Sequence, residues 1–136
     1  MPKIKISPEP KPNWKNYLIK ARQFLETARE AYLKKNWSAV GLNAVHSAIC
    51  ANDSLTIYYG EIRSTSEKHS DAVGLLLRVF KNEKEAEKNS KHLLWLINRK
   101  NLVEYESRLF FQSEAEDTLK HAERFLNWAR SKLPGL

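Results

Sequence analysis

Apolar residues recur at steps of three and four along most of this chain, which is the spacing of an amphipathic helix. The step is most regular in two stripes near the ends of the sequence. The first stripe consists of Leu18, Ala21, Leu25, Ala28 and Tyr32, and the last of Ala115, Leu119, Ala122, Phe125, Leu126, Ala129 and Leu133. Because side chains at these steps share one face of a helix, the pattern predicts helices over about residues 13–35 and 113–133.

Three further helices are expected between these two. The second runs from about 38 to 59 and is expected to stop at Gly60, because glycine readily adopts the left-handed conformation that ends many helices. The third begins near 64–65, and the fourth follows a polar turn within 81–90 and continues to about 99–101. Their predicted buried side chains are Ala44, Val45, Ala48, Ile49, Leu55, Tyr59, Val73, Leu76, Leu77, Phe80, Leu93, Leu94, Leu96 and Ile97.

Cap residues and prolines mark where the helices start and stop. A Ser or Asn stands three residues before a Glu, as in a capping box, at Ser64–Glu67, Asn82–Glu85 and Ser113–Glu116. Four prolines fall within residues 1–12 and none between 13 and 133, and no strand-like alternation of useful length is found. We therefore predict a flexible lead-in over 1–12, followed by one all-α domain over 13–136 that is an antiparallel bundle of about five helices.

Composition indicates the cellular compartment of the protein more clearly than its function. The net charge of +7 favours a polyanionic partner such as nucleic acid, although lysines interleaved with glutamates also suit a solubilising surface. A single cysteine, Cys50, fits a reducing cytoplasm, and no run resembles a signal peptide or a bilayer-spanning segment. We therefore expect a cytoplasmic protein that has no membrane contact.

A polar stripe follows the predicted second helix beside its buried face. Asn43, His46, Cys50 and Asp53 are spaced so that they share one side of the helix. These residue types are able to bind zinc or to supply a base with its orienting carboxylate, but a fourth zinc ligand has to come from His69, His92 or His121. The simpler alternative is a structural polar network. We predict no metal and no cofactor.

The densest polar cluster follows the fourth apolar stripe, at residues 98–105. Arg99 and Lys100 are suited to holding a phosphate, Glu104 to acting as a base or binding Arg99, and Tyr105 to stacking or hydrogen bonding. A break in patterning of this kind is typical of functional sites, although a frayed helix end gives the same pattern. His69, close to Arg63 at the start of the third helix, is either part of an anion pocket or a plain surface residue.

Four segments resemble one known family. They are residues 43–53, Arg63-Ser64 with His69, residues 99–105 and residues 122–129. Together they resemble the HEPN superfamily, small helical domains often encoded beside nucleotidyltransferases in toxin–antitoxin systems. Many members are metal-independent ribonucleases that carry an Arg followed four to six residues later by a His. The segment from Lys100 to Tyr105 resembles a subgroup whose motif reads Lys-Asn-x-x-Glu-Tyr.

The resemblance assigns Arg99 to the signature arginine, but Glu104 or Tyr105 stands where the histidine is expected. In ribonuclease members it implies a dimer around RNA, in which histidine activates the 2′-hydroxyl and arginine steadies the phosphate. A carboxylate at Glu104 repels that phosphate. We therefore expect a non-catalytic homodimer that binds RNA, a nucleotide or a partner protein, such as a nucleotidyltransferase. The expected groove is lined by Arg99, Lys100, Asn101, Glu104 and Tyr105, together with His46, Asp53 and His69.

Two alternatives stay open at this stage. One is a divergent metal-independent endoribonuclease that uses Arg99 with Glu104 or Tyr105. The other is a purely structural helical partner in a toxin–antitoxin pair. For that role the chain offers aromatic surface at Trp14, Trp37, Trp95 and Trp128.

Overall fold

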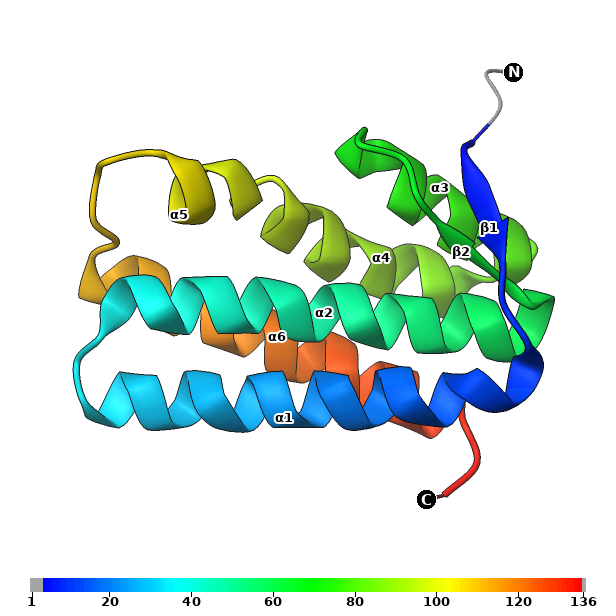
Figure 1. Cartoon of the computed structure of the whole chain (residues 1–136), viewed down its shortest axis with the longest axis horizontal. Coiled ribbons are helices and arrows are strands. Elements are labelled where there is room, and N and C mark those ends of the chain that lie inside the picture. Colours follow the sequence, from blue (N-terminus) through cyan, green and yellow to red (C-terminus); the bar gives the residue numbers. More distant parts are fainter. Residues whose placement is uncertain (1–3, 136) are drawn as a thin grey trace.

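The computed structural model describes residues 4–135, apart from the side chain of His69. Within this range five long helices and one short one account for most of the chain (Figure 1). They are α1 (Trp14–Leu33), α2 (Trp37–Gly60), α3 (His69–Val79), α4 (Lys84–Ile97), the short α5 (Lys100–Tyr105) and α6 (Gln112–Ser131). A 3-10 turn, η1 (Lys11–Asn13), precedes α1. The predicted all-α bundle is confirmed.

Helix α2 is the centre of the bundle. It runs antiparallel to α1 and also packs against α6, α3 and α4 (Figure 1). Its contact faces carry small side chains that have no exposed surface, including Ala44, Ala48 and Ala51, and α1 contributes Ala21 and Ala28. Small residues at these positions let the two backbones approach closely. In the described part of the chain, no helix combines the length and apolarity needed to cross a membrane.

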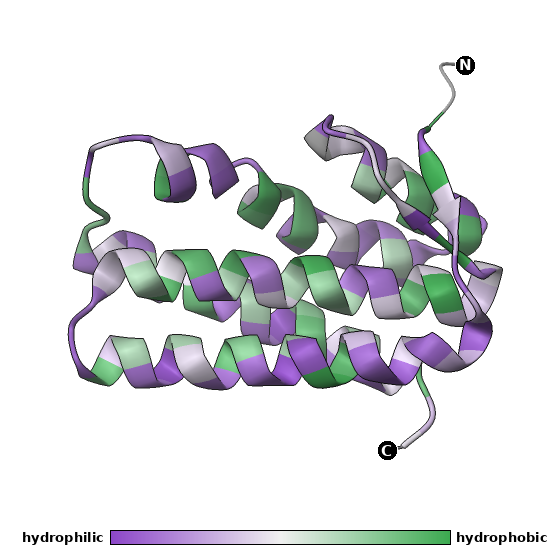
Figure 2. Cartoon of the chain, viewed as in Figure 1, coloured by the Kyte–Doolittle hydropathy of each residue, from purple (hydrophilic) through white to green (hydrophobic). Residues whose placement is uncertain are grey.

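Larger apolar side chains fill the space between the helices. Leu55, Leu76, Leu93, Leu96 and Phe125 come from four helices and are fully buried. Burying one such side chain stabilises the fold by about 1.5–3 kcal/mol. In Figure 2 purple and green residues are interspersed along α1, whereas the first half of α4 is mostly purple and its end mostly green. Helix α5 has no buried residue and is therefore the least anchored of the helices.

A short sheet, which the sequence pattern did not predict, covers one end of α2. Strand β1 (Ile6–Pro8) pairs antiparallel with β2 (Ile62–Ser64), with Ser7 opposite Arg63. The prolines of the lead-in do favour extended backbone, but three residues per strand are too few to show an alternating pattern. Residues 6–8 of the expected flexible lead-in are therefore paired, while residues 1–3 lie outside the described residues. The pairing places β2, the strand that includes Arg63, beside α2 (Figure 1).

Two predicted helix boundaries around this sheet are wrong. Gly60 belongs to α2, and the left-handed residue that ends the helix is Glu61, whose φ is 53°. Helix α3 begins at His69 instead of 64–65, because residues 62–64 are held in β2. The predicted Ser64–Glu67 capping box consequently does not form at a helix start, and the hydroxyl of Ser66 instead donates to Asp71 over 2.6 Å.

The other two predicted caps are also shifted. Helix α4 starts at Lys84 after a turn in which Lys81 and Asn82 both have positive φ, so Asn82 is not its cap. Helix α6 starts at Gln112, where the carboxylate of Glu114 accepts the backbone N–H of Phe111 over 2.8 Å. That contact replaces the predicted Ser113–Glu116 pair.

Candidate ligand-binding cleft

A cleft of about 670 Å³ opens between α2, the β2–α3 connection and the α4–α5 junction. The side chains that line it come from parts of the chain that are distant in sequence. They are His46, Ile49, Asn52, Asp53, Arg63, Ser64, Ser66, Glu67, Lys68, Ala72, Ile97, Lys100, Asn101 and Tyr105. We call this hollow the cleft. Five residues of the predicted groove therefore lie together in it: His46, Asp53, Lys100, Asn101 and Tyr105.

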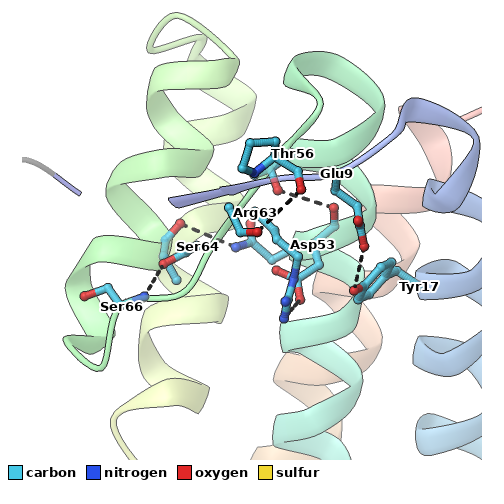
Figure 3. Close-up of polar contacts among 11 residues, drawn as sticks. Glu9, Tyr17, Asp53, Thr56, Arg63, Ser64 and Ser66 are labelled. Atoms are coloured by element: carbon cyan, nitrogen blue, oxygen red, sulfur yellow. Dashed lines mark hydrogen bonds and ion pairs between the residues drawn. The ribbon is translucent and has the colours of Figure 1, made fainter. Parts of the chain in front are cut away.

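An ion pair closes one end of the cleft. Arg63 on β2 donates from Nη2 to Oδ2 of Asp53 on α2 over 3.5 Å (Figure 3). The guanidinium also lies 5.4 Å from the centre of the Tyr17 ring, and the Tyr17 hydroxyl donates to Glu9 over 3.1 Å. Asp53 is only 5% exposed. Its burial raises the pKa of the Asp53 carboxyl to about 6, a shift that the charge of Arg63 partly opposes.

The carboxylate of Glu104 on α5 binds a side chain of α2. Nε2 of His46 lies 2.8 Å from Oε1 of Glu104, and Nζ of Lys100 lies 3.5 Å from Oε2 of the same carboxylate. Burial by itself raises the pKa of Glu104, but hydrogen bonds from His46 and Tyr105 and the charge of Lys100 lower it overall. A charged Glu104 accepts a hydrogen bond from Nε2–H of His46, and in the neutral form of the ring Nδ1 is then the acceptor.

An unsatisfied amide lies in the wall of the cleft. Asn52 is 2% exposed, and its Nδ2 donates to the carbonyl of Ala72 over 3.4 Å. Its Oδ1 is buried and has no hydrogen-bond partner among the described residues, and the same is true of Nε of Arg63. Buried polar atoms are normally paired, so Asn52 leaves one acceptor and Arg63 one donor unsatisfied beside the cleft.

Arg99 does not join the other predicted site residues. Its guanidinium lies 3.4 Å above the Trp95 ring, and Nη1 donates to the Trp95 carbonyl over 2.8 Å. His121 of α6 stacks on the same indole at 4.1 Å, and two planar groups this close must occupy opposite faces of the ring. Burial lowers the pKa of Arg99. The guanidinium is thus engaged on Trp95 of α4, and Arg99 is not among the residues that line the cleft.

Two more predicted site residues, Glu104 and His69, are not among the described side chains that line the cleft. Glu104 lies behind the cleft wall, where it binds His46 and Lys100 instead of Arg99. His69 begins α3, but its side chain lies outside the described residues. Sequence reasoning did not single out Asn52. The signal for it was a second polar residue directly before Asp53, which places Asn52 beside the polar stripe of the helix.

The polar stripe on α2 was predicted to be a zinc site, a base with its orienting carboxylate, or a structural polar network. No three His, Cys, Asp or Glu side chains converge as metal ligands anywhere in the described residues. The carboxylate that orients His46 is Glu104 of α5, and not Asp53. Burial raises the pKa of the Cys50 thiol to about 11, so Cys50 is no nucleophile at neutral pH. Two residues of the stripe bind other elements, Asp53 binding β2 and His46 binding α5, whereas Asn43 donates to the Ala39 carbonyl of its own helix.

Comparison with known families assigns this fold. A family model of the HEPN domain matches residues 14–132. This chain belongs to the HEPN domain family. The match includes all six α-helices of the HEPN domain and every residue that lines the cleft, whereas β1 lies before it. No curated protein matches the chain.

Proposed function

We propose that this HEPN domain binds RNA or a nucleotide in the cleft and does not cleave it. The observation that carries the proposal is the meeting of cationic side chains from three elements at one hollow. Arg63 comes from β2, Lys68 from the residue before α3, and Lys100 from the start of α5. Cations arranged in this way attract phosphate, and the positive end of the α3 dipole adds to them.

The cleft also offers acceptors for the uncharged part of such a ligand. Oδ1 of Asn52 lacks a partner among the described residues, and the carboxylate of Asp53 lies next to it in the sequence. A nucleotide combines an anionic phosphate with hydroxyl and amino donors, so it suits a site that has both kinds of group. A volume of about 670 Å³ is within the range of small-ligand sites.

The positions of Arg99 and Glu104 support binding without cleavage by the family's usual route. That route needs an arginine beside the scissile phosphate, and here the guanidinium is stacked on Trp95. Glu104 is already bound to His46 and Lys100. Neither side chain is therefore free to act on a phosphodiester in the cleft.

Binding at low and rising salt tests the proposal. We expect labelled single-stranded RNA or adenosine monophosphate to bind at low salt, and the affinity to fall as salt increases. Lys100→Met, which removes the charge and keeps the aliphatic stem, should weaken binding about tenfold. Lys91→Met removes one charge from an exposed position of α4 outside the cleft and should leave the affinity within about twofold.

Two results would contradict the proposal. One is the failure of every RNA and nucleotide to bind at low salt. The other is equal weakening by Lys100→Met and Lys91→Met, which would place the ligand on the general basic surface. In that case a protein partner would be the better occupant of the cleft.

One observation favours a second candidate function, a metal-independent ribonuclease. His46 lines the cleft, and in its neutral form the hydrogen bond from Nε2 to Glu104 leaves Nδ1 as an acceptor. As a general base, Nδ1 would take the proton of a 2′-hydroxyl. The oxygen would then attack the adjacent phosphorus to form a cyclic phosphate, and the departing 5′-oxygen would take a proton from water. His46 therefore replaces Arg99 as the residue to test.

RNA cleavage in EDTA decides between binding and cleavage. Loss of cleavage in His46→Gln, with cleavage retained in Arg99→Ala, would support the ribonuclease and overturn the binding proposal. Equal cleavage by the wild type and both variants would indicate a contaminating nuclease. No cleavage by the wild type is the result that we expect.

Exposed apolar side chains on α5 and on the connection from α5 to α6 support the predicted homodimer as a further part of the proposal. Tyr105 is 75%, Leu109 73% and Phe111 62% exposed. Large apolar side chains that stay exposed within seven residues of sequence are candidates for an interaction surface. Light scattering of the wild type and of Leu109→Ser tests this, because a dimer that uses this surface should dissociate in the variant.

A further inference from the structure

A second hollow lies on the other side of α2, between α1 and α2. Its volume is about 640 Å³, and its outer wall is formed by Tyr17, Lys20 and Phe24 of α1. We call it the α1 groove. It shares His46, Ile49, Asp53 and Arg63 with the cleft. The two hollows therefore adjoin along one row of side chains, and a ligand that crosses this row contacts both.

The α1 groove has the chemistry of a base-stacking site. The half-buried Phe24 ring lies 5.7 Å from the His46 ring, at an interplanar angle of 34°. Tyr17 is also half-buried, and the Nζ atom of Lys20 lies 5.2 Å from the centre of its ring. Aromatic rings next to an exposed ammonium are the usual means of holding one nucleotide of a single strand, because the ring stacks on the base and the ammonium attracts the phosphate.

We infer that the α1 groove is a second nucleotide subsite, so that the domain prefers a single strand of two or more nucleotides to a mononucleotide. The inference rests on the proposed function. One nucleotide occupies the cleft beside Arg63 and Lys100, and the strand crosses α2 at His46. The next base then stacks on Phe24, with a backbone phosphate near Lys20. A mononucleotide fills only one of the two hollows.

Chain-length dependence of binding tests this inference. The ligands are adenosine monophosphate, a 5′-phosphorylated diadenylate and a tetra-adenylate, both oligonucleotides being 2′-O-methylated so that no cleavage is possible. We expect the dinucleotide to bind about tenfold or more tightly than the mononucleotide. Phe24→Ala should abolish this gain and leave the mononucleotide affinity unchanged. Leu33→Ala, at an 81% exposed position of the same helix, is the matched control and should change neither affinity.

A second variant keeps the test independent of folding. Lys20→Glu alters an exposed side chain, so it should reduce dinucleotide affinity without loss of thermal stability. Equal affinities for the mononucleotide and the dinucleotide would overturn the inference and leave the proposed function standing. Equal weakening of both ligands by Phe24→Ala and by Lys20→Glu would also overturn it. If no ligand of any length binds, the proposed function fails together with the inference.

Discussion

Glu104 of α5 accepts a hydrogen bond from His46 of α2 over 2.8 Å, and this contact holds a six-residue helix that buries none of its own side chains. The other anchor of this region is Val103, which lies against Gly41 of α2. The wall of the cleft formed by α5 is therefore held mainly by polar contacts. Such contacts are sensitive to pH and to substitution in a way that the packed core is not.

We predict that Glu104→Ala loosens α5 without unfolding the bundle. Amide hydrogen exchange at residues 100–105 should rise at least tenfold, because the carboxylate that binds both His46 and Lys100 is lost. The midpoint of global unfolding should fall by only a few degrees, since α5 contributes no buried residue. Exchange that increases equally in α2 and α5 would contradict this prediction.

Lowering the pH should loosen α5 in the same way as Glu104→Ala. The pKa of Glu104 is lower in the folded protein than its ordinary value. Its contribution to stability is therefore present above that ordinary value and is lost as the pH falls through the folded pKa. Hydrogen exchange measured at several pH values, corrected for the intrinsic rate, should show α5 opening before α2. In Glu104→Gln the ratio of the α5 to the α2 rate should not change with pH.

Ionisation of the buried Asp53 should change stability with pH in the opposite direction to ionisation of Glu104. Its pKa is raised to about 6, so the folded state favours the neutral carboxyl relative to the unfolded chain. The stability that this group contributes is greatest at acid pH and is lost as the pH rises through about 6. In urea unfolding, the stability of the wild type relative to Asp53→Asn should decrease by about 1–3 kcal/mol between pH 4.5 and 7.5. A relative stability that rises over this range would show that Arg63 governs the ionisation of Asp53.

The sequence predicted the helices well because their signal is long. The stripe from Leu18 to Tyr32 spans four turns of α1, so a single exception does not obscure it. Strand β1 has three residues, and its pairing with β2 depends on a contact across more than fifty residues of sequence. Because of that contact, α3 begins at His69, and Ser64 lies in β2 instead of capping a helix. Local patterns carry no information about such a pairing.

The candidate site was predictable in composition but not in orientation. Lys100 and Tyr105 line the cleft, as their polar surroundings predict, but the neighbouring Arg99 does not. Helix α4 ends at Ile97 and α5 begins at Lys100, so Arg99 lies in the junction between them. The guanidinium then finds the Trp95 ring of the preceding turn. The other face of that ring is covered by His121 of α6. The contact of Arg99 with Trp95 therefore depends on where α6 packs, which the sequence around Arg99 does not indicate.

Arg99 should therefore behave as a structural residue. We predict that Arg99→Ala lowers the free energy of unfolding by about 1–2 kcal/mol, because the contact with the indole and the hydrogen bond to the Trp95 carbonyl are lost. Its effect on nucleotide affinity should be less than twofold, in contrast to Lys100→Met. Urea denaturation and titration calorimetry on the same samples separate the two effects. A large loss of affinity in a stable Arg99→Ala protein would restore Arg99 to the site.

Two glycines in helices provide a matched pair of substitutions. A Cβ atom at Gly41 would meet the ring of the buried Phe110, and would lie 2.8 Å from Cγ2 of Val103. At Gly74 it would meet only the end of the Ile4 side chain, at 3.3 Å. Gly41→Ala should destabilise the protein by about 1–3 kcal/mol, whereas Gly74→Ala should stabilise it by about 0.5–1 kcal/mol. Thermal unfolding of both variants checks the signs, and destabilisation of similar size in both would contradict the close approach at Gly41.

The paired histidines between α4 and α6 should make that contact sensitive to acid. Nδ1 of His92 and Nδ1 of His121 lie 2.8 Å apart, so one ring donates and the other accepts. Burial lowers the pKa of both rings. The charges of Lys88 and Arg124 act in the same direction, as does that of Arg99 on His121, and only Asp117 opposes the shift at His121. Protonation of both rings turns two N–H groups toward each other and breaks the hydrogen bond.

The sign of the effect follows from the depressed pKa values. The neutral pair stabilises the fold above the ordinary histidine pKa of 6.5, and this stability is lost as the pH falls through the folded values. We predict NMR titration midpoints below 6.5 for both rings, with amide exchange at the facing turns of α4 and α6 increasing over the same pH range. His92→Gln should remove that pH-dependent increase. A midpoint above 6.5 for either ring would contradict this prediction, and for His121 it would mean that Asp117 outweighs burial and the neighbouring cations.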